Sequence, residues 1–528
     1  MSECHASTQG AIWSEAAGAE RRAEPRPEPG VPAGARFQPI NRQQLLYRAV
    51  DVEQLLEPDH LARAIWEMTG RLDLRAYTTE VRAVEGRAGR PPVDPRLLIA
   101  LWVYAYSERV SSAREVERRC DYHPAYPWLT GCEAINHHTL SDFRVQHQTA
   151  LDGLFAQLLA ILSSEGLITL EQVVHDGTKV KAAASSQSFH REATLRRHLQ
   201  AAQERVRAMG DPRDEKIDRR TQAARQRAAR ENVEHLQQAL EELKKVQAAP
   251  EGRADPAERR ASETDPQARN MRQGDGGSAP SYNVQISTDA ADAIIVGASV
   301  TPDANDQQQL GPAVEEIQRQ NGRVPGQMIV DDGYTTRENI VAAEGQQAWE
   351  LIGTGNVGAG AAEATARRLE KRGVAPEFHP QNFSFDAATN TYTCPAGKTL
   401  TYRYTKHDRV GVERKAYRAQ AADCGACPFR QQCCPGAPSR SLVHTENVPT
   451  VAAYIARMQT AAARAAYRLR APVAEFTHAW LKAKLGLRQF CVRGLKKVCC
   501  EVLWACLTYN IQQWFRLRWK VRLAAVVA

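Results

Sequence analysis

The C-terminal part of the sequence has very few acidic residues. Residues 441–528 contain three of them, Glu446, Glu475 and Glu501, against fourteen Lys and Arg. Because the whole chain has a formal net charge of +8, the residues before this segment are mildly acidic in sum. A basic segment on an otherwise balanced chain is typical of a protein that binds a polyanion, usually nucleic acid. A solvated basic helix would explain the charge alone.

Long apolar runs are also missing. The most apolar C-terminal stretch, 498–515, contains Glu501 and three amide side chains. It is shorter than a membrane span, and its pattern predicts an amphipathic helix. Residues 1–36 are rich in Ala, Gly, Pro, Glu and Arg and lack the apolar core of a secretory signal, so we expect a disordered tail. These features predict a cytoplasmic protein without a membrane partner.

The 528 residues are enough for two or three domains, and the first of them has a helical pattern. Apolar residues recur at helical spacing in "DPRLLIALWVYAYSERV" (94–110). Two further helical segments, 111–131 and 136–162, are separated by a Pro/Gly turn. They could form a helix-turn-helix that binds DNA, with Arg144 near the leading end of its second helix. An ordinary helical bundle fits the same pattern equally well.

Strand patterns begin further along the chain. A first strand is expected at 170–182, where "VVHDG" (173–177) is followed by a long helical hairpin or coiled coil from Glu192 to Val246. The elements expected after it are strands at 281–289 and 293–300, a helix at 306–320, a strand at 326–334, a helix at 335–346 and a strand at 349–355. This order predicts an α/β fold with a mixed sheet, in which three antiparallel strands continue into α/β units.

Aspartates lie where two of these strands are expected to end. Asp176 is predicted to close the first strand, and Asp331 and Asp332 follow the strand that contains Val330. A carboxylate after an apolar strand is costly unless a cation or a hydrogen bond stabilises it. Either site alone is explained equally well by an Asp that forms a turn before Gly. Together with Glu475 they could instead bind the two divalent metals that phosphodiester chemistry uses.

From about residue 37 to 515 the sequence resembles the DDE transposases of bacterial insertion sequences. "VVHDGTKVKAAAS" (173–185) resembles the family's first-aspartate block, and "PSYNVQISTDA" (280–290) resembles its second-strand block. "IVDDGYTTRENI" (329–340) is similar to the second-aspartate block, Asp-x-Gly-Tyr. That pattern selects Asp331 rather than Asp332.

A fourth stretch resembles the family's Tyr-Arg-Glu-Lys block, with Tyr467, Arg470, Glu475 and Lys482 in its positions. Six residues separate Glu475 from Lys482, as in the family, but four rather than three separate Arg470 from Glu475. The resemblance implies an RNase-H-like core in which Asp176, Asp331 and Glu475 bind two Mg²⁺ ions, with Mn²⁺ as a substitute. It also implies that Tyr467, Arg470, Lys482 and Arg488 contact DNA.

Cysteines are concentrated between the last predicted strand and Glu475. Cys394, Cys424, Cys427 and Cys433 could supply four thiolates to a tetrahedral Zn²⁺, and Cys434 is then a spare. Free thiols are the alternative. The later cysteines lie on the predicted C-terminal helix and are expected to be small core residues: Cys491, Cys499, Cys500 and Cys506.

The expected organisation is a disordered tail (1–36), a helical DNA-binding domain (37–165), an RNase-H-like core (166–186, 276–356 and 448–515), a helical insert (187–275), a Cys-rich insert (357–447) and a basic tail (516–528). The expected function is a nucleoid-associated DNA transposase that cuts the ends of its insertion sequence and joins their 3′-ends to target DNA, as a homodimer. Two alternatives are a non-catalytic DNA-binding regulator derived from a transposase and an RNase-H-like metal nuclease.

Overall fold

The computed structural model describes residues 49–79, 91–209, 219–248, 255–346, 348–355, 357, 359–407, 413–446 and 449–527. Residues from Asp51 onward form one compact unit. The predicted disordered tail lies outside the described residues. So do the first residues of the predicted helical domain and the segment 210–218 of the predicted helical insert.

The described N-terminal residues are helical, as predicted. A 3₁₀ turn, η1 (Val52–Leu55), is followed by α1 (Leu61–Gly70), α2 (Arg75–Thr78), α3 (Pro95–Ser107), α4 (Ala113–Tyr122), α5 (Ala125–Thr130), α6 (His137–Gln146) and α7 (Gln148–Ser164). The Asp94 side chain accepts a hydrogen bond from the backbone N–H of Arg96 and caps α3, which contacts α1, α5 and α6. Each of the two helices predicted after α3 is in fact two shorter helices.

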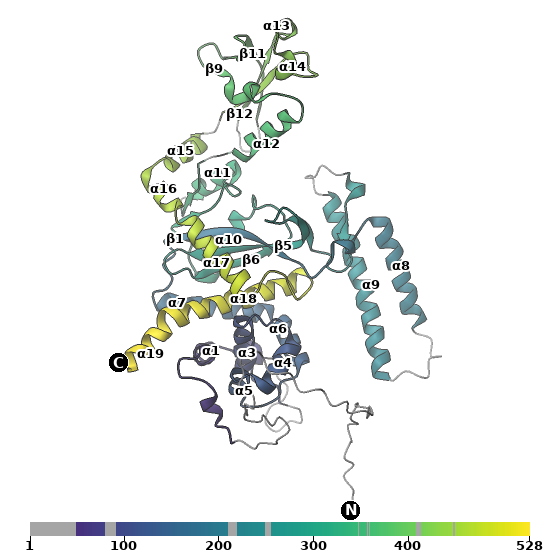
Figure 1. Ribbon diagram of the computed structural model, residues 1–528, viewed down its shortest axis with the longest axis vertical. Coiled ribbons are helices and arrows are strands. Elements are labelled where there is room, and N and C mark those ends of the chain that lie inside the picture. Colours follow the sequence, from purple (N-terminus) through teal and green to yellow (C-terminus); the bar gives the residue numbers. More distant parts are fainter. Residues whose placement is uncertain are drawn as a thin grey trace, which may run out of the picture. The chain divides into compact units, whose positions relative to one another are not determined.

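A mixed sheet follows the helices, and it contains the predicted strands in the predicted order together with one strand, at 269–272, that was not predicted. The strands are β1 (Gln172–Lys181), β4 (Arg269–Arg272), β5 (Ser278–Asp289), β6 (Ile295–Thr301), β7 (Gln327–Ile329) and β8 (Glu350–Ile352). β5 is antiparallel to β1, β4 and β6, whereas β1, β7 and β8 are parallel. The helices α10 (Leu310–Asn321) and α11 (Arg337–Gln346) connect the later strands, and α10 contacts β6 (Figure 1).

The first strand lies within its predicted range, but Asp176 is not at its end. β1 pairs with β5 along its length, from Val173 opposite Asp289 to Lys181 opposite Ser281. Asp176 lies in the middle of this ladder, opposite Ile286. The turn that an Asp-Gly pair could form does not occur at Asp176–Gly177, because the chain stays extended there and pairs with β5.

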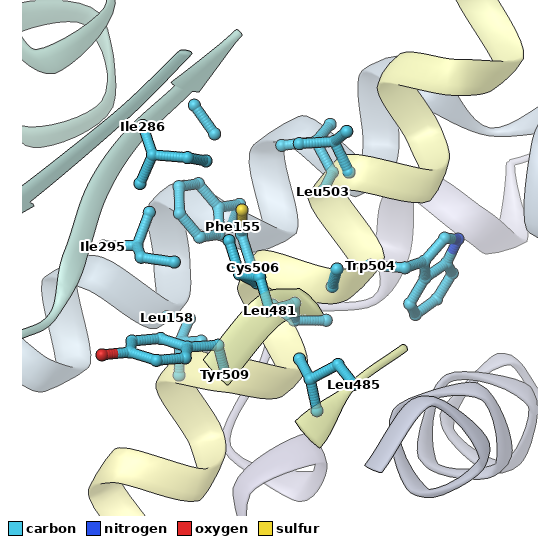
Figure 2. Close-up of a cluster of buried hydrophobic side chains, with 14 of the residues drawn as sticks. Phe155, Leu158, Ile286, Ile295, Leu481, Leu485, Leu503, Trp504, Cys506 and Tyr509 are labelled. Carbon is cyan, nitrogen blue, oxygen red and sulfur yellow. The ribbon is translucent and has the colours of Figure 1, made fainter. Parts of the chain in front are cut away.

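The C-terminal helices complete the core around the sheet. After α15 (Pro449–Met458) and α16 (Ala461–Tyr467), α17 (Arg470–Ala479) contacts β1 and β5 and continues into a π-helical turn, η6 (Trp480–Lys484). α18 (Leu495–Trp514) contacts β6 as well as α3 and α7. Figure 2 shows the resulting cluster, in which Cys506 and Tyr509 of α18 lie among Phe155 of α7, Ile295 of β6 and Leu481 of η6.

α18 is buried on nearly all sides, so the predicted amphipathic helix is wrong. The polar residues that interrupt its apolar pattern are buried too and bind backbone groups. The Glu501 carboxylate accepts hydrogen bonds from the backbone N–H groups of Cys491 and Val492, and the Asn510 side chain bonds both the N–H and the C=O of Ile295. Neighbouring elements therefore cover the face that the sequence pattern assigned to solvent.

The chain continues as helix beyond α18. The segment predicted as a basic tail forms a π-helical turn, η7 (Phe515–Trp519), and α19 (Lys520–Val527). Trp519 is buried and donates a hydrogen bond from its indole N–H to Glu67 of α1, which also pairs with Arg522. None of the helices in the described ranges is long and apolar enough to cross a membrane.

The predicted helical insert is a helical hairpin. α8 (Glu192–Ala208) and α9 (Arg219–Ala248) pack against each other through a small apolar cluster of their own. The hairpin is flanked by the 3₁₀ turns η2 (Ser186–Ser188) and η3 (Pro256–Glu258) and by a two-stranded ladder of β2 (Phe189–His190) and β3 (Ala261–Ser262). The ladder joins the chain that enters the insert to the chain that leaves it.

The Cys-rich region contains a second sheet that its weak periodicity did not predict. Five antiparallel strands, β9 (Ser384–Asp386), β10 (Thr391–Thr393), β11 (Thr399–His407), β12 (Glu413–Ala419) and β13 (Ser441–Glu446), follow α12 (Ala359–Glu370) and the 3₁₀ turns η4 (Pro376–Phe378) and η5 (Pro380–Asn382). Two short helices, α13 (Ala421–Gly425) and α14 (Arg430–Cys433), carry cysteines. β11 is largely exposed on both faces, with Leu400 its one buried residue, so an apolar alternation is weak there.

Candidate functional site

The strand register brings two of the predicted acids together. β1 and β7 are adjacent parallel strands, with Val174 opposite Ile329. Asp176 and Asp331 each come two residues later, so both lie at the same level on neighbouring chains, which are about 4.8 Å apart in a sheet. The even spacing also places both side chains on the same face. Asp332, one residue later, is exposed and accepts a hydrogen bond from Thr354 instead.

A cation of the protein lies between the two carboxylates. The Nη2 atom of Arg470, at the start of α17, is 2.9 Å from Oδ2 of Asp176 and 3.5 Å from Oδ2 of Asp331. The other oxygen of each carboxylate accepts a backbone N–H, from Gly177 and Gly333 respectively. The Nε–H of Arg470 is buried without a hydrogen-bond partner among the described residues. The pair of aspartates therefore fits a cation, and Arg470 fills that role incompletely.

Burial dominates the electrostatics of the two acids. It raises the pKa of Asp176 to about 6, although Arg470 acts in the opposite direction and Asp331 adds to the rise. Burial also raises the pKa of Asp331, and the positive charge of Arg470 again opposes this rise. His478, eight residues after Arg470 on α17, lies 3.8 Å from Asp176, and burial lowers its pKa to about 4. His478 is therefore neutral near pH 7 and leaves the negative charge for another cation.

A third aspartate, Asp306, lies close to this pair and was not predicted. It follows β6, and its Oδ1 atom accepts hydrogen bonds from the amides of Asn283 (2.7 Å) and Gln285 (2.8 Å) on β5. Its charge contributes to the raised pKa of both Asp176 and Asp331. The sequence signal was a loop with two acids, "PDAND", directly after a predicted strand.

Gly177 allows these groups to approach one another. A Cβ atom at this position would lie 2.5 Å from Oδ1 of Asp306, 2.6 Å from Nε2 of Gln285 and 3.0 Å from the Tyr334 hydroxyl. The hydroxyl in turn donates to Oε1 of Gln285, which also bonds Nε2 of the buried His175. The glycine of the predicted Asp-Gly-Thr block is thus needed for packing beside the acids and not for a turn.

Basic residues predicted to bind DNA surround the aspartates. Lys482 is half-buried, and its pKa is lowered by burial and by the positive charges of Arg488 and Lys179, while Asp176 opposes the shift. Arg488 is exposed, and its backbone C=O accepts from Lys181 at the end of β1. Tyr467 is half-buried beside Arg470. The structure therefore gathers four of the five predicted DNA contacts near Asp176.

Arg144 is the fifth, and it lies elsewhere. Its side chain is buried in the helical domain, where its guanidinium stacks on Trp102 and donates to the backbone C=O of Ser111. A guanidinium with these partners does not reach a phosphate. This placement argues against the predicted DNA contact at Arg144.

Glu475 does not join the group of aspartates in this conformation. It is exposed on α17, and the described residues offer it neither a hydrogen bond nor an ion pair. The buried side of α17 carries Ala474 and Thr477. In the described parts of the chain, no three metal-ligating atoms that include those of Asp176 and Asp331 lie within 4.8 Å of one another.

The predicted relation between Glu475 and Lys482 also changes. Seven residues of a regular α-helix would place both on one face. The π-helical turn η6 begins at Trp480, between the two residues, and alters this spacing. Such turns are frequent at functional sites.

The four predicted zinc ligands line the same cavity, but their thiols are too far apart to bind one metal ion in this conformation. Cys394, Cys424, Cys427 and Cys433 line one cavity of about 20 Å³, together with Cys434. This volume holds about one water-sized atom. No three of these thiols lie within 4.8 Å of one another among the described residues. Backbone N–H groups of Lys398 and Arg440 point at the sulfur atoms of Cys394 and Cys424, an arrangement that stabilises thiolates.

Two segments of the chain match known families. Residues 50–146, which span η1 to α6, match the model of a transposase domain (DUF772). Residues 393–515 match the model of the transposase DDE domain and include Arg470, Glu475 and Lys482. The two matches support the recognition of the chain as a DDE transposase of an insertion sequence. No curated protein matches the chain significantly.

Proposed function

We propose that this transposase cuts the ends of its insertion sequence and joins the 3′-ends to target DNA by two-metal phosphoryl transfer. The observation that carries the proposal is the pair Asp176 and Asp331, which lie side by side on parallel strands and face one cation. A partly buried pair of carboxylates is costly without a cation, and Mg²⁺ prefers such oxygen ligands. An RNase-H-like core with this order of strands is part of the same proposal.

Asp176, Asp331 and Glu475 would hold two Mg²⁺ ions, or Mn²⁺, which when bound supply an activated water and stabilise the leaving 3′-oxygen. For this, Asp176 has to be ionised and released from Arg470. Glu475 has to turn toward the aspartates from the exposed side of α17. The freed Arg470 guanidinium is then available to a DNA phosphate.

Positive charge beside the aspartates fits a DNA backbone. The positive charges of Arg488 and Lys179 each lower the pKa of Lys482, and a bound phosphate would offset this repulsion. Tyr467 lies next to Arg470 and is placed to contact the same strand. Under this proposal the helical domain binds the inverted-repeat ends, and a homodimer in the bacterial cytoplasm, associated with the nucleoid, pairs the two ends.

One observation favours a second candidate, a DNA-binding regulator without catalysis. Glu475 is exposed and apart from the aspartates, so the ligand set is incomplete in this conformation. A regulator would bind the ends but leave them uncut.

The test is a cleavage and joining assay with purified protein, linear DNA that carries the inverted repeats, and a target plasmid, in Mg²⁺ or in EDTA. We expect nicked and joined products in Mg²⁺ alone, and their loss in Asp176→Asn, Asp331→Asn and Glu475→Gln. Asp332→Asn is the matched control and should remain active, because this side chain faces Thr354. Binding without cleavage would support the regulator, and cleavage without joined products would support an RNase-H-like nuclease.

A further inference from the structure

Three metal-ligating side chains meet at the base of the helical insert, in a place that the transposase chemistry does not use. His190 ends β2, His198 lies in the second turn of α8, and Glu263 directly follows β3. One ligand atom of each lies within 4.8 Å of those of the other two. Of the described residues, these form the one group of three potential ligands that approach one another this closely.

One of the two distances between an imidazole and the Glu263 carboxylate is a hydrogen bond, and the other is longer than a hydrogen bond. Nδ1 of His198 is 2.8 Å from Oε2 of Glu263, whereas Nε2 of His190 is 3.6 Å from Oε1, beyond hydrogen-bond length. Ligand atoms around a tetrahedral Zn²⁺ are about 3.3 Å apart, given metal–ligand bonds of about 2.0–2.1 Å. The two N–O separations, which involve different oxygens of Glu263, lie on either side of this value. The imidazole rings are 5.1 Å apart between centroids and steeply inclined, so they do not stack.

The backbone around the three residues is well held. The Ser188 and Ser262 hydroxyls bond each other at 2.7 Å, and the backbone N–H of Glu263 donates to the C=O of Ser188. The Ser262 hydroxyl also accepts from the backbone of Thr264 and Asp265. The positions of His190 and Glu263 are therefore fixed by the ladder, and binding a metal would need adjustment of side chains alone.

We infer that His190, His198 and Glu263 bind a divalent transition metal, Zn²⁺, with water as the fourth ligand. Imidazole and carboxylate groups suit Zn²⁺, and three protein ligands leave one open position. The metal would link the first helix of the insert to both strands of the ladder at its base. It would therefore stabilise the insert where the chain enters and leaves it. This site is separate from the cysteine cluster and does not depend on the proposed catalytic mechanism.

The experiment uses the full-length protein with Cys424→Ser and Cys427→Ser, so that the thiolate cluster cannot bind the probe. The metal-free protein is titrated with Co²⁺, and bound Zn²⁺ is then measured by competition. We expect one equivalent of Co²⁺ with visible d–d bands typical of tetrahedral nitrogen and oxygen ligands and without a thiolate charge-transfer band. His198→Ala and Glu263→Gln should each weaken binding by about tenfold or more.

His235→Ala is the matched control, because His235 lies in the same hairpin on α9 and outside the group. It should bind Co²⁺ and Zn²⁺ as the parent does. Circular dichroism of every variant shows whether the helices are retained, and Glu263→Gln keeps the shape of the side chain if His198→Ala does not fold. The inference is overturned if the parent binds no Co²⁺, or if both ligand variants bind it with the affinity of the control.

Discussion

Asp176→Asn should make the metal-free protein more stable while it abolishes DNA cleavage. In the folded protein, burial raises the pKa of Asp176 from 3.8 to about 6. A shift of about two units corresponds to roughly 3 kcal/mol, at about 1.4 kcal/mol per unit. The side chain is 18% exposed, so solvent screening reduces this value only moderately. Asparagine resembles the protonated acid in shape and charge. We therefore expect a gain of up to about 3 kcal/mol near pH 7.

The gain depends on pH with a defined sign. A carboxyl group whose pKa is higher in the folded than in the unfolded state stabilises the fold below the unfolded value and loses this contribution as the pH rises through the folded value. The metal-free parent should therefore lose stability between about pH 4 and pH 6 relative to Asp176→Asn. Below that window the two proteins should have equal stability, since the parent is then protonated as well.

Urea unfolding in EDTA, followed by tryptophan fluorescence near pH 4 and pH 7.5, measures the difference. Added Mg²⁺ should stabilise the parent and leave Asp176→Asn unchanged, because a ligand that binds only the folded state stabilises it. Asp332→Asn controls for the loss of any nearby charge and should change stability by less than about 0.5 kcal/mol. A lower stability of Asp176→Asn near pH 7.5 would refute the reasoning, since the ion pair with Arg470 would then outweigh the cost of burial.

Three further changes test other parts of the structure. Gly177→Ala should strongly reduce DNA cleavage, because the added Cβ would lie 2.5 Å from Oδ1 of Asp306. Circular dichroism should show that the fold is retained. Activity equal to that of the parent would contradict this packing. Asn510→Ala should lower the free energy of unfolding by about 1–3 kcal/mol for each buried group of Ile295 that it leaves unpaired, as measured by urea unfolding. Phe155→Ala should cost about 3–5 kcal/mol in the same assay, because the ring is fully buried in the cluster of Figure 2, and a cost below about 1 kcal/mol would show that the cluster is not packed as drawn.

Much of the core could be predicted because its signals are local. Apolar alternation marked the strands, and helical spacing with the cap at Asp94 marked α3. The parallel pairing of β7 with the first residues of β1 places Asp176 and Asp331 together, and the family resemblance pointed to the same two residues. Cysteine spacing likewise indicated which thiols would share one cavity.

Other features depend on partners that are distant in the chain. β1 continues past Asp176 because β5 supplies hydrogen bonds there, and a local Asp-Gly pair cannot show this. α18 is covered on both sides by elements from other parts of the sequence, so its polar residues are buried against backbone groups and do not form a solvent face. Arg144 has the positive charge that suggests a DNA contact, but its side chain is buried like that of a core residue.

The sequence by itself indicated a transposase, most strands and helices of the mixed sheet, and the two residues of the carboxylate pair, since these follow from local pattern and from motifs of adjacent residues. Only the tertiary structure decided that Arg470 lies between the aspartates, that Asp306 joins them and that Glu475 is exposed. It also brought His190, His198 and Glu263 together across an insert of more than sixty residues. The physical reason is that charge pairing and metal coordination depend on distance in space, which the fold sets through contacts between remote segments.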